Sequence, residues 1–170
     1  PVWDADAAVH RLYDRGGDAV ARIGALCPDA VIDGAVSRAA LKDWIARDPA
    51  ALGQIEAVVH PLVAADRNAF LASIDTDIVV IDVPLLFETG ATSQIDAVVV
   101  VSVAPDIQRA RVLERGTMDP DTFETILAKQ IPDNEKRARA DYVIETTTLE
   151  SARAAVQSVL KDIRKKVANA

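Results

Sequence analysis

Two aspartates separated by one residue stand near the start of the sequence, in the run PVWDAD. Val2 and Trp3 favour a strand, so Asp4 and Asp6 are expected at or just beyond its carboxyl end. Ligands of open α/β sheets bind at that edge. A carboxylate there could accept a proton from a substrate hydroxyl or help to place Mg²⁺. The alternative is that one or both aspartates simply cap the helix that follows.

The segment IDVPLLFE, residues 81–88, offers a second place for chemistry. An apolar strand runs into Asp82, and an aspartate at the end of such a strand resembles the Walker B pattern that supports Mg²⁺ in phosphate-transfer enzymes. The apolar residues after Pro84 could line a pocket for a flat or apolar part of a ligand. The alternative is a core strand followed by a plain loop.

Basic residues supply a third group of candidates. Arg111 and Arg115 are related as i and i+4, so they share a helix face from which they could clamp phosphate oxygens. A solvated helix surface is the alternative. His60 precedes Pro61 inside an apolar helical pattern, where proline is expected to break or kink the helix. A histidine in that setting is either structural or catalytic.

Composition narrows the class of protein. The net charge of −7 argues against a duplex DNA binder, although a few focused arginines suffice for a nucleotide. One cysteine, Cys27, and two histidines are too few for a zinc site of the usual kind. The single cysteine also fits a reducing cytoplasm. No apolar run approaches a membrane span. The motifs G-x-S-x-G and G-x-x-x-x-G-K-[ST] do not occur in the 170 residues.

Four apolar runs predict the strands that position these side chains. They cover residues 1–3, 78–83, 97–103 and 142–145. Nearly continuous Val and Ile indicate a parallel sheet covered on both faces. Roughly 70 mostly helical residues separate the first two strands, more than one crossover helix needs. We therefore expect a helical insertion that forms one wall of a substrate site.

Several helix boundaries can be predicted from capping residues. Ser37 and Asp119 are expected to cap helices, and Pro105 and Gly116 to open and close another. The last helix should begin at a capping box, Thr147-x-x-Glu150. Asp48-Pro49 is expected to start the long helix that includes His60. The residues of the last helix expected to be buried are Leu149, Ala152, Val156, Leu160, Ile163 and Val167.

In this order, the segments PVWDAD, VVHPL, VIDVPLLFE, QRARVLERG and AKQIPDNEKRARADYVIET resemble dephospho-coenzyme A kinases over essentially the whole chain. The resemblance implies an α/β fold of the P-loop kinase type, with a five-stranded parallel sheet, helices on its faces, a helical substrate-binding insertion and a lid. The implied reaction transfers the γ-phosphoryl group of ATP, with Mg²⁺, to the ribose 3′-hydroxyl of dephospho-coenzyme A.

The resemblance also implies roles for particular residues. Asp6 matches the family's proposed base, and Arg111 an arginine assigned to the transferring phosphoryl group. Arg115 and Arg137 match positions near ATP, at the lid and its return. Asp82 is an indirect candidate for the metal. The residues expected at the acceptor substrate are Asp4, His60, Pro61, Pro84, Leu85, Leu86, Phe87 and Glu88.

One departure from the family pattern is large. In the family a strand, a Walker A loop and a helix precede the DAD motif, and the size of βαβ units makes that segment about 20–30 residues. The implied strand order is 2-3-1-4-5, so residues 1–3 would be the second strand and the missing first strand would be central. Its absence would leave two strand edges unpaired. We therefore expect the natural polypeptide to contain the P-loop segment.

The expected organisation is one kinase unit over residues 1–170. Its sub-regions are a helical coenzyme A region (7–75), core strands with a helix (77–115), a lid with flanking helices (116–140) and the last strand with the C-terminal helix (141–170). Expected partners are ATP and dephospho-coenzyme A, with no nucleic acid and no membrane, in a cytoplasmic monomer. Two alternatives stay open: another P-loop nucleoside or nucleotide kinase, and a non-catalytic coenzyme A binding module.

Overall fold

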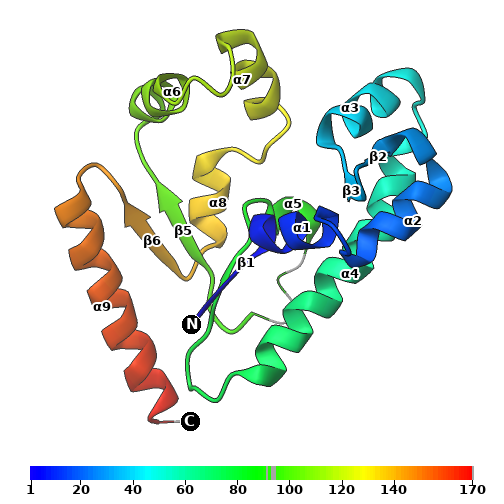
Figure 1. Cartoon of the computed structure of the whole chain (residues 1–170). Coiled ribbons are helices and arrows are strands. Elements are labelled where there is room, and N and C mark those ends of the chain that lie inside the picture. The colour runs from blue at the N-terminus through cyan, green and yellow to red at the C-terminus, as the bar shows by residue number, and fades with distance from the viewer. Residues whose placement is uncertain (91, 93–94, 170) are drawn as a thin grey trace. The chain divides into compact units, whose positions relative to one another are not determined.

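The computed structural model describes residues 1–90, 92 and 95–169, and shows short parallel strand pairs flanked by helices (Figure 1). Its internal contacts divide the chain into two compact units, Pro1–Pro84 and Leu85–Ala170, each of which is described by itself. The sub-regions expected from the sequence stay a prediction. In the described part of the chain, no helix has the length and hydrophobicity that a membrane span requires.

The first unit contains a parallel strand pair, β1 (Val2–Asp4) with β4 (Val80–Asp82). Val2 pairs with Val80 and Asp4 with Asp82, so the two strands end in register. Parallel strands need a long crossover connection, and here mostly helical chain supplies it. The first two predicted strands are confirmed; the first is shifted by one residue from 1–3, and the second is shorter than the predicted 78–83.

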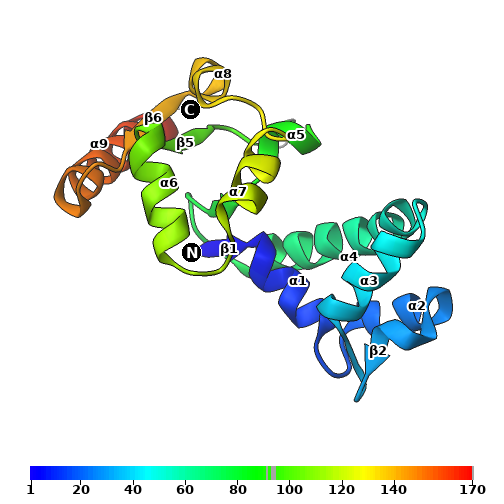
Figure 2. The same cartoon turned by 90° about the horizontal axis from the view of Figure 1, so that it is seen from above.

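Helices make up most of this crossover. The elements are α1 (Ala5–Tyr13), α2 (Asp18–Leu26), the 3₁₀ helix η1 (Pro28–Ala30), β2 (Val31–Ile32), β3 (Ala35–Val36), α3 (Arg38–Arg47) and α4 (Ala51–Ser73). Figure 2 shows α2, α3 and β2 gathered along one end of α4. Their apolar faces form one core of Leu12, Ala19, Ile23, Ala30, Val36, Leu41, Ile55, Val59 and Leu62. The helical insertion expected from the sequence is therefore present.

Helix α4 differs from the prediction at both proline positions. It continues through Pro61, where a break or kink was expected, and no break is present. Proline removes one backbone hydrogen bond, but Ile55, Val59 and Leu62 keep the same face buried on both sides of it. The helix also begins at Ala51, later than the predicted start, because the Asp48 side chain instead accepts a hydrogen bond from the Ala50 amide at 2.8 Å.

A short antiparallel hairpin, β2–β3, was not predicted from the sequence. Its two-residue turn is Asp33-Gly34, and both residues have positive φ, 51° and 79°. That pair of angles belongs to the primed turns that match strand twist, and Asp-Gly is a strong sequence signal for them. The hairpin could therefore have been found from the sequence.

The second unit holds the other parallel pair, β5 (Val99–Ser102) with β6 (Tyr142–Glu145). Its helices are α5 (Leu86–Thr89), α6 (Pro105–Glu114), α7 (Pro120–Leu127), α8 (Asp133–Arg139) and α9 (Leu149–Val167). Helix α9 packs against β6, and α8 against β5. The pairs β1–β4 and β5–β6 are neighbours in the expected order, while the complete order 2-3-1-4-5 stays a prediction.

The caps were predicted with mixed success. Asp119 and Ser37 cap their helices as expected, and Gly116, at φ 66°, follows the end of α6. The capping box of α9 is wrong by one residue, since Thr148 and Ser151 form it.

The predicted buried face of α9 is also partly wrong. Leu149 is 69% exposed, and Val156 and Val167 are about two-fifths exposed. Ala152, Leu160 and Ile163 are the members of that predicted face that are partly buried. The sequence periodicity therefore gave a wider apolar stripe than the helix buries.

Candidate functional site

Three candidate carboxylates lie around the carboxyl ends of β1 and β4. Asp4 and Asp82 are register partners as the last residues of these strands. The Asp4 side chain accepts a hydrogen bond from the Ala7 amide at 2.9 Å, so Asp4 is the N-cap of α1. Asp6 lies in the first turn of α1 with an exposed side chain. The helix dipole favours a negative charge there, and Asp6 is not the capping residue.

A fourth carboxylate, Asp66 on α4, was not singled out from the sequence. Its Oδ1 accepts hydrogen bonds from the Trp3 indole Nε1 and from Arg11 Nη2, both at 2.7 Å. Burial acts to raise the pKa of Asp66, but these two hydrogen bonds and the Arg11 charge outweigh burial and lower it. The spacing of Trp3, Arg11 and Asp66 in the sequence does not predict this cluster, because the cluster forms only when α4 packs beside β1.

An open cavity of about 500 Å³ borders this cluster. Its lining residues are Val2, Trp3, Asp4, Ala7, Arg11, Asp66, Ala69, Phe70 and Ser73. The wall combines apolar side chains with the Asp66–Arg11 ion pair. Of the residues predicted from the sequence, it contains Asp4.

His60 and Pro61 lie on α4 with exposed side chains. Their neighbours Val59 and Leu62 are buried in the helical core. Because the buried neighbours fix the rotation of α4, His60 and Pro61 are turned toward solvent. The exposed position leaves both alternatives for His60, structural and catalytic, open, and a role in binding the acceptor stays a prediction.

The segment Leu85–Glu88 is divided between surface and core. Leu85 is 43% exposed, whereas Phe87 is buried and carries the Arg139 guanidinium over its ring, 4.4 Å from the centroid. Pro84, the last residue of the first unit, is exposed, and Leu86 is partly buried. Within the second unit, Leu85 is therefore the member of this segment most available to a ligand.

Glu88 joins α5 to the segment around α8. Its Oε1 accepts hydrogen bonds from the Ile131 amide at 3.0 Å and from Lys136 Nζ at 2.8 Å, and the Glu88 and Lys136 side chains are each 17% exposed. Burial acts to raise the pKa of Glu88, but Lys136 and the backbone donors lower it overall. Glu88 thus has partners within the protein, and its proposed contact with substrate stays a prediction.

Arg137 lies at the carboxyl ends of β5 and β6. Its Nη1 donates to Ser102 Oγ at 3.1 Å and its Nη2 to Glu145 Oε1 at 3.0 Å. The Ser102 hydroxyl in turn donates to Asp133 Oδ2 at 2.8 Å. Ser102 was missed from the sequence, although a polar residue at the end of the run AVVVVSV was a usable signal. The network holds Arg137 at the sheet edge where α/β proteins bind ligands.

Arg111 and Arg115 differ in how they are held. Arg111 donates from Nη1 to the Thr146 carbonyl at 2.8 Å and from Nη2 to the Thr147 carbonyl at 3.1 Å. Arg115 is exposed and forms the C-cap of α6. A guanidinium carries more N–H donors than the Arg111 contacts use, so Arg111 is anchored and still able to donate to an anion.

The described residues contain no group of three or more His, Cys, Asp or Glu side chains that could hold a metal ion by themselves. Asp4 and Asp82 nonetheless supply two carboxylates at one sheet edge. Mg²⁺ is commonly held by one or two carboxylates, with water and substrate phosphates completing its octahedron. The donor set therefore fits a magnesium ion that arrives with a nucleotide.

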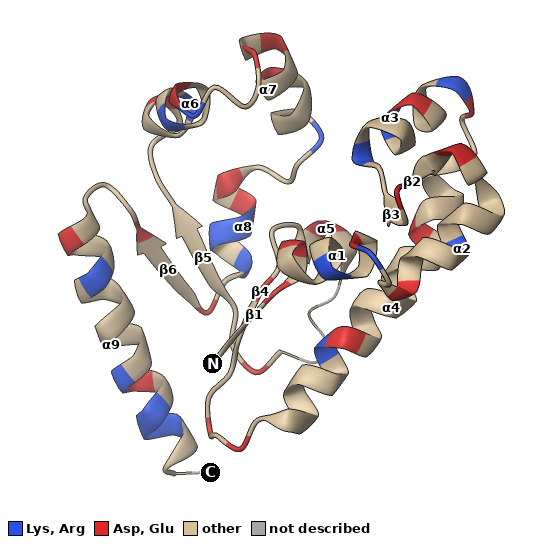
Figure 3. Ribbon diagram, viewed as in Figure 1, with Lys and Arg blue, Asp and Glu red and all other residues tan. Residues whose placement is uncertain are grey.

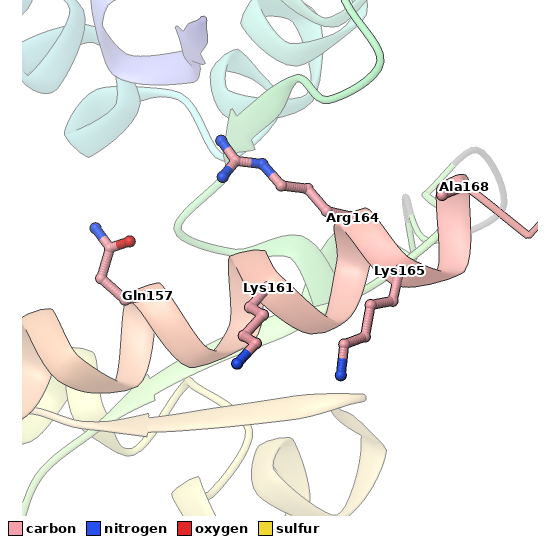
Figure 4. A pocket seen from close by; sticks show the side chains of 5 residues that line it. All are labelled: Gln157, Lys161, Arg164, Lys165 and Ala168. Carbon is pink, nitrogen blue, oxygen red and sulfur yellow. The ribbon is translucent and has the colours of Figure 1, made fainter.

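A second open cavity, of about 560 Å³, lies along α9. In Figure 4, Lys161 and Lys165 extend to one side of the helix, and Gln157 and Arg164 to the other. Figure 3 shows that Lys and Arg are concentrated on the C-terminal half of α9. None of the residues predicted for the site lines this cavity, so we do not assign chemistry to it.

Comparisons with known proteins agree on one family. A family model described as dephospho-CoA kinase matches residues 1–151. A dephospho-CoA kinase of Cereibacter sphaeroides is 60% identical over 164 residues, 96% of this chain and 83% of the relative. One from Ruegeria pomeroyi is 59% identical over 163 residues, with the same shares covered.

Solved structures resemble the chain as well. The TT1252 protein of Thermus thermophilus superposes with a TM-score of 0.82 at 31% identity, covering 95% of this chain and 84% of that one. A dephospho-CoA kinase from Campylobacter jejuni, at 20% identity and a TM-score of 0.66 over 97% and 85% of the two chains, shares the fold. By its sequence matches over nearly its whole length, the chain belongs to the dephospho-CoA kinase family.

Proposed function

We propose that Asp6 is the base in the reaction of this family, the ATP-dependent phosphorylation of dephospho-coenzyme A that completes coenzyme A synthesis. The observation that carries the proposal is the register of β1 and β4, which ends both strands in an aspartate and is followed directly by the exposed Asp6. Asp4 is engaged as a helix cap. Asp6 is therefore the aspartate of the DAD motif best able to accept the proton of the ribose 3′-hydroxyl.

One other carboxylate suits the metal. Asp82, the last residue of β4, would help to hold Mg²⁺ indirectly. When bound, Mg²⁺ neutralises charge on the phosphates of ATP. The work of the protein's own residues is then to position the acceptor hydroxyl and remove its proton.

The arginines supply positive charge where negative charge develops. Arg111 is proposed to stabilise the transferring phosphoryl group, and its two carbonyl contacts fix the guanidinium before substrate arrives. Arg137, held by Ser102 and Glu145, and the exposed Arg115 are proposed to bind ATP. Phosphoryl transfer depends mainly on such positioning and charge stabilisation.

The acceptor substrate is assigned to two groups of residues. The exposed His60 and Pro61 on α4 are proposed to contact it in the first unit. The remaining candidates are Asp4, Pro84, Leu85, Leu86, Phe87 and Glu88. Leu85 is the most exposed of the apolar ones. We further propose a cytoplasmic monomer, for which the single Cys27 and the acidic composition are the support.

The test is ADP release by the full-length protein with ATP, Mg²⁺ and dephospho-coenzyme A, against a control without the acceptor. Acceptor-dependent ADP is expected. Release that instead requires adenosine, uridine or AMP would favour another P-loop kinase. Tight binding of dephospho-coenzyme A without binding of ATP would favour a non-catalytic binding module.

The role of Asp6 is tested by Asp6→Asn, which keeps the size of the side chain and removes its basicity. We expect kcat to fall by about 10²–10⁴-fold, the contribution of a positioned base. Asp18→Asn is the matched control, because Asp18 is also an exposed aspartate in the first turn of a helix, α2. Near-normal turnover by Asp6→Asn would remove Asp6 from the chemistry.

A further inference from the structure

We propose that Asp66 is a positioning residue for phosphoryl transfer, because one oxygen of its carboxylate holds both ends of the segment that carries Asp6. The inference deepens the proposed function and rests on the role given there to Asp6. It assigns to α4 a task beyond packing and beyond presenting His60: fixing the place of the base.

The geometry centres on a single atom. Oδ1 of Asp66 accepts a hydrogen bond from Trp3 Nε1 and another from Arg11 Nη2, each 2.7 Å long. Trp3 lies in the middle of β1 and is 3% exposed, and Arg11 lies in the last turn of α1. These two anchors bracket the junction between strand and helix, which contains Asp6.

The two anchors restrain different motions of α1. Trp3 fixes the strand from which α1 starts, and the Asp4 cap fixes its first turn. Arg11 fixes the far end, so α1 can neither swing away from α4 nor turn about its own axis without breaking a charged contact. Because Asp6 lies on α1, the same contacts restrain the position of its carboxylate. A displacement of about 1 Å in a reacting group can lower a rate roughly 10²-fold.

The same residue connects two candidate groups. His60 precedes Asp66 on α4 by about 9 Å of helix axis. Because α4 is continuous through Pro61, a contact at Asp66 sets the position of α1 relative to the helix that carries His60. Asp66 therefore holds the base and a proposed acceptor contact in one frame within the first unit.

The strength of the two bonds differs. The Arg11 side chain is 56% exposed and that of Asp66 is 23% exposed, so solvent screens part of their attraction. Both bonds share the ionised Oδ1, and the Trp3 bond is the stronger restraint because its donor is buried and less screened by solvent. The same two contacts lower the pKa of Asp66, so they favour its ionised form.

The experiment compares Asp66→Asn, Asp66→Ala and Arg11→Ala in the full-length protein. Asp66→Asn can still accept from Trp3 but loses the ion pair, so we expect kcat to fall about 10-fold. For Asp66→Ala, which loses both bonds, the expected fall is about 10²-fold. KM for ATP should change less than about twofold in each. Glu56→Gln, at an exposed acidic position on α4, is the control and should leave kcat unchanged.

A second measurement separates positioning from general destabilisation. In the Asp6→Asn background the base is already lost, so Asp66→Asn should lower kcat by less than about twofold further. Arg11→Lys should recover part of the loss seen in Arg11→Ala. If Asp66→Asn and Arg11→Ala leave kcat unchanged, or if their effects multiply fully with Asp6→Asn, the inference is wrong. Normal turnover by Asp6→Asn alone would instead overturn the proposed function.

Discussion

Replacement of Ser102 by alanine tests whether the protein itself fixes the position of Arg137. Ser102 is 5% exposed, donates to Asp133 and accepts from Arg137. Each bond has a charged partner, and such bonds contribute about 1.5–3 kcal/mol each to stability. The Arg137 side chain is 38% exposed, so water replaces part of what is lost. We expect Ser102→Ala to lower the free energy of unfolding by about 1.5–3 kcal/mol.

The assay is urea unfolding followed by circular dichroism, with thermal unfolding alongside. A loss of that size corresponds to a fall in Tm of about 3–12 °C for a chain of this length. Ser158→Ala is the matched control, since Ser158 lies on the exposed side of α9. KM for ATP should also rise severalfold in Ser102→Ala if Arg137 binds the nucleotide.

Two results would contradict this reasoning. A change in stability within about 0.5 kcal/mol, the range of ordinary surface substitutions, would mean that the Ser102 hydroxyl exchanges its partners freely with water. A clear loss of stability with an unchanged KM for ATP would show that the network stabilises the fold but that Arg137 does not bind the nucleotide.

Two further predictions concern packing and pH. Gly17→Ala should destabilise the first unit by about 2–3 kcal/mol in urea unfolding, because a Cβ at Gly17 would collide with the Leu12 carbonyl; Gly53→Ala, on open helix surface, should instead stabilise it by about 0.5–1 kcal/mol. The pKa of Glu88 is lowered on folding, so the folded state binds fewer protons than the unfolded state. The free energy of unfolding should therefore fall as the pH drops below 4.5, the usual pKa of a glutamate. Glu88→Gln should make the free energy of unfolding less dependent on pH below 4.5, and Lys136→Met should do so in part. An unchanged pH dependence in Glu88→Gln would show that this ion pair does not cause the loss of stability in acid.

The strand pairs were predictable because their signal is local. Continuous Val and Ile at 78–83 and 97–103 favour strands whatever the rest of the chain does. The burial on both faces that these runs led us to expect is not seen, since Val80 is 48% and Val101 65% exposed. Helix caps such as Asp119 were equally predictable, because one side chain and the next turn decide them. Of the break or kink expected at Pro61, the break is wrong because packing of α4 outweighed the local preference of proline, and a kink stays a prediction.

The candidate site divides in the same way. Asp4, Asp6 and Asp82 could be placed at one sheet edge because strand ends fix their neighbourhood, and the register of β1 with β4 bears this out for Asp4 and Asp82. Asp66 could not, because its partners lie far away in the sequence and only tertiary packing brings them together. Ser102 was missed although its place at the polar end of an apolar run was a usable signal. Their chemical roles stay predictions until the variants are measured.

The separation in sequence between paired strands has a consequence for the order in which the chain assembles. Val2 pairs with Val80, whereas the core of the helical insertion lies between Leu12 and Leu62. Contacts between residues near in sequence require only small loops and form early, whereas contacts between distant residues form late.

During synthesis the helical insertion would leave the ribosome before β4, the strand that pairs with β1. About 20 residues separate Leu62 from Asp82, which at roughly 5–20 residues per second gives about 1–4 s. For that interval β1 has its helices but not β4, and the edge with Val2 is open to other chains. The helical core, with the Asp-Gly hairpin inside it, can thus hold β1 in place while the rest of the sheet is still being made.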